Sequence, residues 1–307
     1  MTYYFYFIAG VKILCKIPFP VVIQREAEEF LFYIKSTEEI QAAEKEADVQ
    51  AEFVPSAYLP EIPENAVQKA DRYYSRDREG RQMVHYCPCP GKEPYACAIW
   101  EKIQEACSDC PGQLRFICRY LPGSEFRFGY SRMISDHIGM ETLFLQKDCL
   151  LLHASFISWK EKGILFTGPS GIGKSTQANL WHKYENVEIL NGDRAAVKKG
   201  RDGWYAYGLP YAGSSGIYRN ESARLETVIV LRQAEGNRIR KLGLLETIQS
   251  LYPEVMIHHW DREFIEKALT ILTEMSGDIP FCLLECRPDR EAVETVKKWI
   301  SEGAGLW

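Results

Sequence analysis

The sequence predicts an α/β fold in its second half, preceded by a smaller α+β domain. Two observations support this prediction. An apolar, β-prone run at residues 163–167 leads into a glycine-rich loop, and a helical segment at 177–183 follows the loop. Further strands and amphipathic helices then alternate up to residue 301, whereas residues 1 to about 125 contain mainly strand signals. We therefore expect one domain at 1–125 and a second at 126–307.

The glycine-rich loop fits the pattern G-x-x-x-x-G-K-[ST] without a gap. Its glycines allow backbone conformations in which successive N–H groups surround an anion, and the helix that follows presents the positive end of its dipole. A strand before the loop and a helix after it are the context expected of a phosphate-binding loop, although an ordinary glycine-rich turn would have the same flanks. The residues predicted to bind nucleotide are Gly168, Ser170, Gly171, Ile172, Gly173, Lys174, Ser175 and Thr176.

Composition and charge indicate a globular protein. The 307 residues are 46% hydrophobic and 26% charged, and the formal net charge is -5. This balance argues against a nucleic-acid or membrane-surface partner. Residues 1–8 are apolar but have no basic residues before them, so we expect a strand there and a cytoplasmic protein. The sequence does not decide whether the protein is a monomer or a homo-oligomer.

Cysteines are concentrated in one part of the first domain. Cys107 and Cys110 have zinc-like C-x-x-C spacing, but Cys87 and Cys89 form a C-x-C and supply no matching second pair. We therefore expect reduced thiols, with a structural zinc site as the alternative. Five more cysteines in apolar runs are expected in the core: Cys15, Cys118, Cys149, Cys282 and Cys286.

The first domain is expected to contain several strands and one short helix. The helix is predicted at 26–34, and the acidic segment 38–48 is either a solvated helix or a linker. Residues 76–80 end in a glycine and are predicted to form the turn of a hairpin. The predicted strands are 11–17, 49–54, 71–75, 81–86, 95–103 and 113–121.

The second domain is expected to begin with a helix at 131–147. Strand 149–157 should pair with strand 163–167 through a short turn, so that the phosphate-binding loop follows an antiparallel hairpin. Further strands are predicted at 187–190, 195–198, 204–207, 225–231 and 281–286, and helices at 244–251, 263–275 and 290–301.

A carboxylate partner for Mg²⁺ is predicted at Asp193. Such a carboxylate usually follows a neighbouring strand, and Asp193 follows the apolar run 187–190. Ser175 and Asp193 are thus the expected metal ligands, and Arg194 is a cation available to phosphate oxygens. A simple turn aspartate is the alternative.

Three more basic side chains are candidates for the site. His153 lies on the strand before the loop, where it could act as an acid or base, although a hydrogen-bonded core histidine is the commoner case. Arg219 and Arg224 are candidates for stabilising transition-state charge, or are merely solvated.

From about residue 151 to 220 the chain resembles HPr kinase/phosphorylase and its relatives. The resemblance lies in Leu152-His153-Ala154-Ser155, the loop 168–176, Leu190-Asn191-Gly192-Asp193-Arg194 and residues 208–220. It implies a nucleotide-binding core with a mixed sheet, shared with ATP-dependent phosphoenolpyruvate carboxykinase, and a role for His153. In that family an acidic pair precedes the arginine, whereas Gly192 stands at the first of these positions. The stretch after Arg194 also lacks the signature of true HPr kinases, so the broader group of related kinase-like proteins is the better match.

The resemblance and the motifs together imply a kinase that uses ATP and Mg²⁺. The expected acceptor is a hydroxyl, with a serine of a small protein or peptide as the first hypothesis. The catalytic residues would be Asp193, His153, Lys174, Arg194 and Arg219. Gly192 favours the alternative of a nucleotide-binding scaffold or peptide-maturation partner with little turnover. A kinase of a free metabolite such as serine is a third hypothesis.

Overall fold

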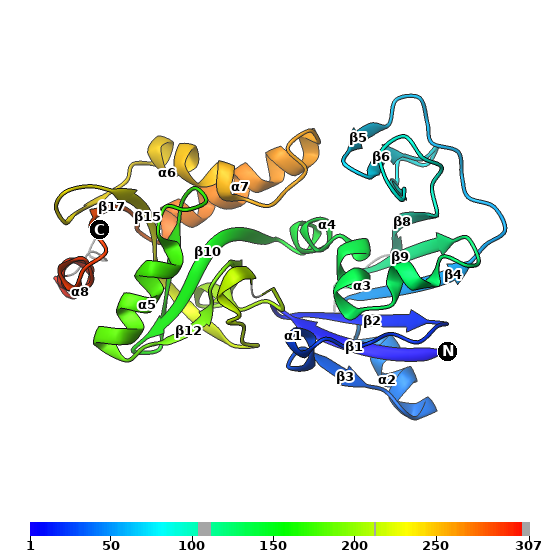
Figure 1. The fold of residues 1–307 in the computed structure, drawn as a ribbon, viewed down its shortest axis with the longest axis horizontal. Helices are drawn as coiled ribbons and strands as arrows, with labels where there is room; N and C mark the ends of the chain where they lie inside the picture. Colours follow the sequence, from blue (N-terminus) through cyan, green and yellow to red (C-terminus); the bar gives the residue numbers. More distant parts are fainter. Residues whose placement is uncertain (104–111, 212, 303–307) are drawn as a thin grey trace. The chain divides into compact units, whose positions relative to one another are not determined.

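The chain is a mixed α/β protein with two sheets (Figure 1). The structure is a computed structural model that describes residues 1–103, 112–211 and 213–302. It divides into two compact units, Met1–Met140 and Glu141–Trp307. Within the described ranges, no helix has the length and apolar character needed to cross a membrane.

The first unit is built on a nine-stranded mixed sheet in the order β3-β1-β2-β4-β9-β8-β7-β6-β5. The pairs β2–β4 and β4–β9 are parallel, and the other neighbours are antiparallel. All the strands predicted in this half are present, and β3 and β5 are additional. The strands are β1 (Thr2–Ile8), β2 (Val11–Ile17), β3 (Leu31–Tyr33), β4 (Val49–Pro55), β5 (Val67–Lys69), β6 (Arg72–Arg76), β7 (Gln82–Tyr86), β8 (Ala96–Ile103) and β9 (Gln113–Tyr120).

Two short helices flank β3 in the first unit. The helix predicted at 26–34 is wrong beyond its first turn: α1 (Arg25–Glu28) ends early, and Leu31–Tyr33 pairs with β1 as β3. Pairing with a sheet edge thus overrides a weak local helix preference. The acidic segment after it is a helix, α2 (Thr37–Glu46), whose start is fixed by a capping box between Ser36 and Glu39.

The helix predicted at 131–147 is two helices, α3 (Ser131–Ile138) and α4 (Met140–Gln146). Gly139 separates them with a left-handed backbone (φ 71°), a conformation that glycine adopts without strain and that ends a helix. The 3₁₀ helix η1 (Glu125–Phe128) precedes α3. The rings of Phe128 and His137 lie 4.5 Å apart, so both elements belong to the first unit. The division between the units therefore comes later than the boundary expected between 125 and 126.

The second unit is built on an eight-stranded mixed sheet. The pairings β10–β13, β13–β14, β14–β15, β15–β11 and β11–β10 form a closed circuit, with β17 and then β16 added beside β15 and β12 paired to β10. Strands β11, β15 and β17 are parallel to one another. The strands are β10 (Cys149–Trp159), β11 (Lys162–Thr167), β12 (Glu188–Asn191), β13 (Arg194–Gly200), β14 (Gly203–Tyr207), β15 (Ser222–Gln233), β16 (Arg238–Lys241) and β17 (Phe281–Cys286).

Helices cover both faces of the parallel strands (Figure 1). Successive side chains of a strand point to opposite faces, so Leu165 joins one hydrophobic cluster while Ile164 and Phe166 join the other. Because both faces are buried there, residues 164–166 of β11 and 228–231 of β15 are continuously apolar. The first cluster packs against α7 and the second against α5 and α8. The helices are α5 (Lys174–Glu185), α6 (Leu244–Leu251), α7 (Arg262–Asp278) and α8 (Arg290–Ser301), as predicted.

The described cysteines carry free thiols. All five of those predicted to lie in the core are buried, whereas Cys89 is exposed. Burial raises the pKa of the Cys149 and Cys282 thiols to about 12, which opposes the thiolate that metal binding requires. Cys107 and Cys110 lie outside the described residues. Within the described part of the chain, no group of three or more His, Cys, Asp and Glu is placed to hold a metal ion.

Candidate functional site

The candidate site lies where β11 ends and α5 begins. Gly168, Gly171 and Gly173 all have positive φ values, of 137°, 79° and 115°. Glycine adopts such conformations without strain, so the loop backbone has the geometry for which the sequence analysis expected glycines. Ser170 and Gly171 are exposed at the loop, and Ile172 packs into the α5–α8 cluster. The helix that starts at Lys174 has Gly173 as its N-cap, so the N-terminus of α5 faces the loop.

Lys174 is buried beneath the loop. Its Nζ donates hydrogen bonds to the carbonyl oxygens of Gly168 and Pro169, at 2.7 and 3.2 Å. Burial lowers the pKa of the Lys174 ammonium, while the charges of Glu254 and Asp193 oppose that effect. The ammonium is therefore bound by the loop backbone and is close enough to two carboxylates to interact with their charges.

Strand register brings His153 to the same place. Ala154 pairs with Thr167, so His153 lies beside the end of β11, and the Thr167 hydroxyl donates to the His153 carbonyl oxygen at 2.9 Å. On the other edge of β10, His153 pairs with Arg194, the residue after Asp193. The antiparallel hairpin predicted from sequence thus positions His153 between the glycine-rich loop and Asp193.

Asp193 lies beside two of the other predicted residues and forms an ion pair with one of them, Arg194. Its Oδ1 lies 3.8 Å from His153 Nε2, and its Oδ2 lies 3.2 Å from Arg194 Nε. The Arg194 guanidinium also lies over the Tyr211 ring, 5.0 Å from its centroid. Arg219 is exposed and follows Tyr218, which forms a bridge with Asn191. Asp193, His153, Lys174 and Arg194 therefore converge, while Arg219 lies on an adjacent segment.

Two hydroxyls point to the backbone just before Asp193. The Oγ atoms of Ser175 and Ser155 donate to the Gly192 carbonyl oxygen at 3.2 and 3.0 Å. Ser175 is half-buried and Thr176 is exposed. The Ser175 hydroxyl and the Asp193 carboxylate are hard oxygen donors of the kind that Mg²⁺ prefers, so these residues fit the ion.

Asn191 organises the loops around Asp193, a role that the sequence analysis did not assign. The side chain is fully buried, and its Nδ2 donates to the carbonyl oxygens of Leu209 and Tyr211 at 2.9 and 3.1 Å. Its Oδ1 accepts hydrogen bonds from the backbone N–H groups of Asp193 and Arg194, both at 2.9 Å. A buried amide with all these bonds made fixes the backbone that carries the carboxylate.

Glu254 is a second residue that the sequence analysis missed. It ends the 3₁₀ helix η3 (Tyr252–Glu254), and its Oε2 lies 3.2 Å from His153 Nδ1. Val255 forms a bridge with Leu152 of β10, which places Glu254 next to the imidazole. The local sequence around Glu254 has no motif, so only the pairing with β10 shows that it belongs to the site.

Gly192 stands where the resemblance predicts an acidic residue, and the surrounding structure leaves no room for one. A Cβ atom at position 192 would lie 2.5 Å from the Cβ of Ser215, in the 3₁₀ helix η2 (Gly213–Ser215), and closer still to its Oγ. A Cβ at Gly213 would lie 2.6 Å from that of Asp193. Thus η2 packs directly on the Gly192–Asp193 backbone.

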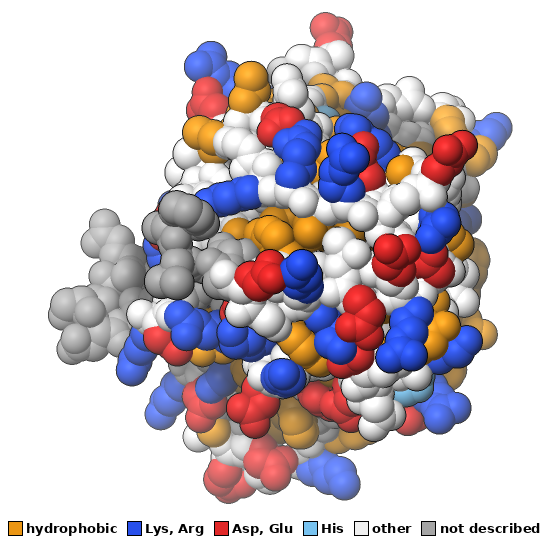
Figure 2. Space-filling view, turned by 90° about the vertical axis from the view of Figure 1, so that its left-hand side faces the viewer, with side chains coloured by type: hydrophobic (Ala, Val, Ile, Leu, Met, Phe, Trp, Pro, Cys, Tyr) orange, Lys and Arg blue, Asp and Glu red, His pale blue; other side chains and the backbone are white. Residues whose placement is uncertain are grey.

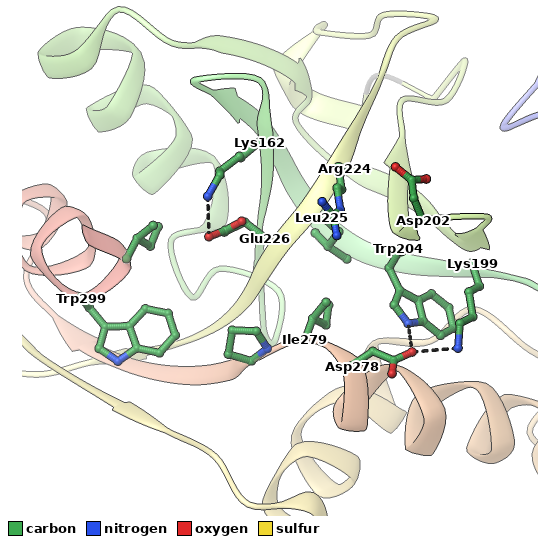
Figure 3. Close-up of a pocket in the computed structure, with 13 residues that line it drawn as sticks. Lys162, Lys199, Asp202, Trp204, Arg224, Leu225, Glu226, Asp278, Ile279 and Trp299 are labelled. Carbon is green, nitrogen blue, oxygen red and sulfur yellow. Dashed lines mark hydrogen bonds and ion pairs between the residues drawn. The ribbon is translucent and has the colours of Figure 1, made fainter. Parts of the chain in front are cut away.

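A cavity of about 560 Å³ lies at the opposite end of the parallel strands (Figure 3). It opens beside Lys162 and Arg224, which are register partners near the starts of β11 and β15. Arg224 is therefore remote from the glycine-rich loop at the other end of β11, and its candidate role in offsetting transition-state charge there is wrong. Most of the cavity's charged groups are paired: Lys162 with Glu226 at 2.9 Å, and Lys199 with Asp278 at 2.9 Å.

The surface on the side where α8 lies carries charges of both signs. Figure 2 shows the side where α8 lies in Figure 1, with hydrophobic side chains gathered near the centre of the face and Lys, Arg, Asp and Glu interspersed around them. The lining of the cavity includes none of the groups that converge at the end of β11. The candidate site is therefore the loop with Lys174, Asp193, His153 and Glu254.

No protein-family model and no curated protein sequence matches the chain. Among solved structures, the chain is similar to the HPr(Ser) kinase/phosphatase from Coxiella burnetii, with a TM-score of 0.31 and 14% sequence identity. The similarity covers 50% of this chain and 90% of that one. Similarity at this level establishes neither a shared activity nor a shared substrate, so the function has to follow from the residues of the site.

Proposed function

We propose that the protein is a Mg²⁺- and ATP-dependent kinase that transfers the γ-phosphate to a hydroxyl. The observation that supports this most is the convergence of Lys174, Asp193 and His153 at the end of β11. A loop that binds phosphates, a carboxylate and a group that can accept a proton are the parts that phosphoryl transfer requires.

The residues of the loop would bind and orient ATP. Backbone N–H groups of the loop and the N-terminus of α5 would surround the phosphates, and Lys174 would exchange its carbonyl contacts for phosphate oxygens. Ser175 and Asp193 would hold Mg²⁺, which offsets phosphate charge when bound. Arg194 lies beside Asp193, and its guanidinium would stabilise the negative charge that develops on the phosphate oxygens in the transition state. The proposed fold of this unit is the core that HPr kinases share with ATP-dependent phosphoenolpyruvate carboxykinase.

The proposed acceptor is a serine of a small protein or peptide. This choice follows from the resemblance in residues 151–220 and not from the site's geometry. A free metabolite such as serine offers the same hydroxyl. Transfer of label from γ-labelled ATP to a panel of small proteins, peptides and free serine distinguishes these acceptors.

Asp193→Asn tests the proposal. The substitution keeps the size of the side chain and removes the charge needed in the transition state, so turnover should fall at least about a hundred-fold while ATP binding persists. The assay is single-turnover transfer alongside ATP titration, with Asp202→Asn at the cavity end as the matched control. Transfer by Asp193→Asn at the wild-type rate would show that the assignment is wrong.

A nucleotide-binding scaffold is the second candidate, and the contact between Gly192 and Ser215 favours it. That contact excludes the second acidic side chain expected in an active kinase of this type. A scaffold would bind ATP in a manner that depends on Lys174 but would transfer no phosphate to any member of the acceptor panel. Consumption of ATP only in the presence of an acceptor would exclude it.

A further inference from the structure

Glu254 is a buried carboxylate that faces one nitrogen of a histidine. Its side chain is only 9% exposed, and Oε2 lies 3.2 Å from His153 Nδ1. A carboxylate removed from water is costly unless charged or hydrogen-bonded groups compensate it. His153 is its hydrogen-bond partner, and the Lys174 ammonium is near enough for the two charges to interact.

The backbone holds Glu254 in this position. Val255 forms a bridge with Leu152, and the Met256 N–H donates to the Leu151 carbonyl oxygen at 2.9 Å. Val255 is also buried in the core between the sheet and α7. The segment after η3 therefore lies along the same edge of β10 as β11 does, just beyond the end of β11. This pairing places Glu254 beside the ring of His153.

This contact determines which nitrogen of neutral His153 carries hydrogen. An ionised carboxylate only accepts hydrogen bonds, so the Nδ1 that faces Glu254 must be the protonated one. Nε2 then has the free lone pair. It faces Asp193 Oδ1 across 3.8 Å, and an ionised carboxylate has no hydrogen to donate to it, so the lone pair stays available.

We infer that Glu254 is a positioning residue that fixes this tautomer, so that Nε2 of His153 accepts the proton of the acceptor hydroxyl. This inference rests on the proposed kinase function. The hydroxyl oxygen forms a bond to the γ-phosphorus as the bond from that phosphorus to the bridging oxygen of ADP breaks. The hydroxyl proton passes to Nε2, and the imidazolium later releases it to solvent.

In this arrangement Asp193 and His153 have different roles, the first in binding Mg²⁺ and the second in accepting the proton. Oδ2 of Asp193 is paired with Arg194, and its backbone is fixed by Asn191, so this carboxylate suits a stationary role such as holding Mg²⁺. His153 is bound through Nδ1 and has Nε2 free. The arrangement resembles a catalytic triad, in which a third group orients the base that activates a nucleophile. Here the nucleophile would be the acceptor hydroxyl, the base His153 and the third group Glu254.

Glu254→Gln tests the inference, with nitrogen shifts of the His153 ring as the first measurement. In the wild-type protein labelled with ¹⁵N at histidine, Nδ1 should carry the proton at a pH where the ring is neutral. The amide that replaces the carboxylate donates as well as accepts, so the population with protonated Nε2 should rise in the variant. His153→Gln identifies the resonances among those of the six histidines.

Turnover is the second measurement. Glu254→Gln should lower single-turnover transfer about a hundred-fold, the scale of a general-base contribution, and leave ATP affinity little changed. Glu266→Gln is the matched control, since Glu266 pairs on the surface of α7 with Arg262 at 2.6 Å. The control should keep the wild-type tautomer and rate.

Two results would overturn the inference: a wild-type His153 protonated at Nε2, or a Glu254→Gln variant that keeps both the wild-type tautomer and the wild-type rate. The wild-type tautomer decides the matter even if the variant does not fold. It is measured without nucleotide or acceptor, so absence of phosphoryl transfer would count against the kinase proposal, while the tautomer would still report on Glu254.

Discussion

Gly192→Ala should destabilise the second unit because Ser215 already occupies the space for a Cβ. Two saturated carbons in ordinary contact lie about 3.5–4.0 Å apart, whereas the added Cβ would lie 2.5 Å from that of Ser215. Rotation of the serine hydroxyl cannot relieve this overlap, because the position of Cβ follows from the backbone. The backbone of η2 would have to move by about 1 Å, which is overpacking that costs about 1–3 kcal/mol.

A double-mutant cycle with Ser215→Gly measures this contact. Ser215→Gly alone loses the hydrogen bond from the Ile217 N–H to Ser215 Oγ, at 3.2 Å, and should cost about 1 kcal/mol. In the Ser215→Gly background, Gly192→Ala should cost much less than in the wild type, so the interaction energy should reach about 1–2 kcal/mol. The cycle is completed by free energies of unfolding, measured by urea denaturation, for the wild type, the two single variants and the double variant.

If the free-energy costs of Gly192→Ala and Ser215→Gly are additive, the reasoning is refuted, because Ser215 then does not restrict the size of the side chain at position 192. The cycle also bears on Gly192→Asp. This substitution would not simply restore a second acidic ligand, because displacement of η2 would also move Gly213 away from Asp193.

Three further predictions concern single side chains. Lys174→Ala should lower ATP affinity about ten- to a hundred-fold, the value of a charge-assisted contact of about 1.5–3 kcal/mol; unchanged affinity in an ATP titration would contradict the phosphate-binding loop. Burial lowers the pKa of His137 from 6.5 to about 4, so its contribution to stability is complete above pH 6.5 and is lost as the pH falls toward 4. Between pH 7.5 and 5 the wild type should therefore lose about 2 kcal/mol more than His137→Gln in urea unfolding, and equal losses would contradict this. Asp278→Ala should cost about 1–3 kcal/mol, because it leaves the buried Trp204 indole N–H without its acceptor at 2.9 Å and Lys199 without one of its ion pairs; Asp278→Asn keeps an acceptor and should cost less in thermal unfolding.

Short-range signals predicted most of the elements. The strand, loop and helix around Lys174 are adjacent in sequence, and their residue types depend on local backbone geometry, so they could be recognised without tertiary contacts. The strands and helices with strong apolar periodicity are present where expected, because their pattern reflects which face is buried. The pairing of 149–157 with 163–167 followed from a short connection, and it positions His153.

Errors arose where a local preference competed with a distant contact. Residues 31–33 include two aromatic residues of the types that favour strands, but a run of three is too short to be told from the end of a helix, and pairing with β1 decides their conformation. In the segment 131–147, the helical pattern continues through Gly139, but the left-handed backbone there breaks it and leaves α3 in the first unit.

The sequence by itself determined that a glycine-rich loop with the pattern of a phosphate-binding loop stands between a strand and a helix, with Lys174 and Ser175 at the start of that helix, and it identified Asp193 and His153 as candidates. Only the tertiary structure decided what surrounds them. Glu254 reaches His153 from 101 residues along the chain, and Ser215 closes the space beside Gly192. Both contacts join segments that are not adjacent in sequence, and they depend on how those segments pack, which no local pattern of residue types describes.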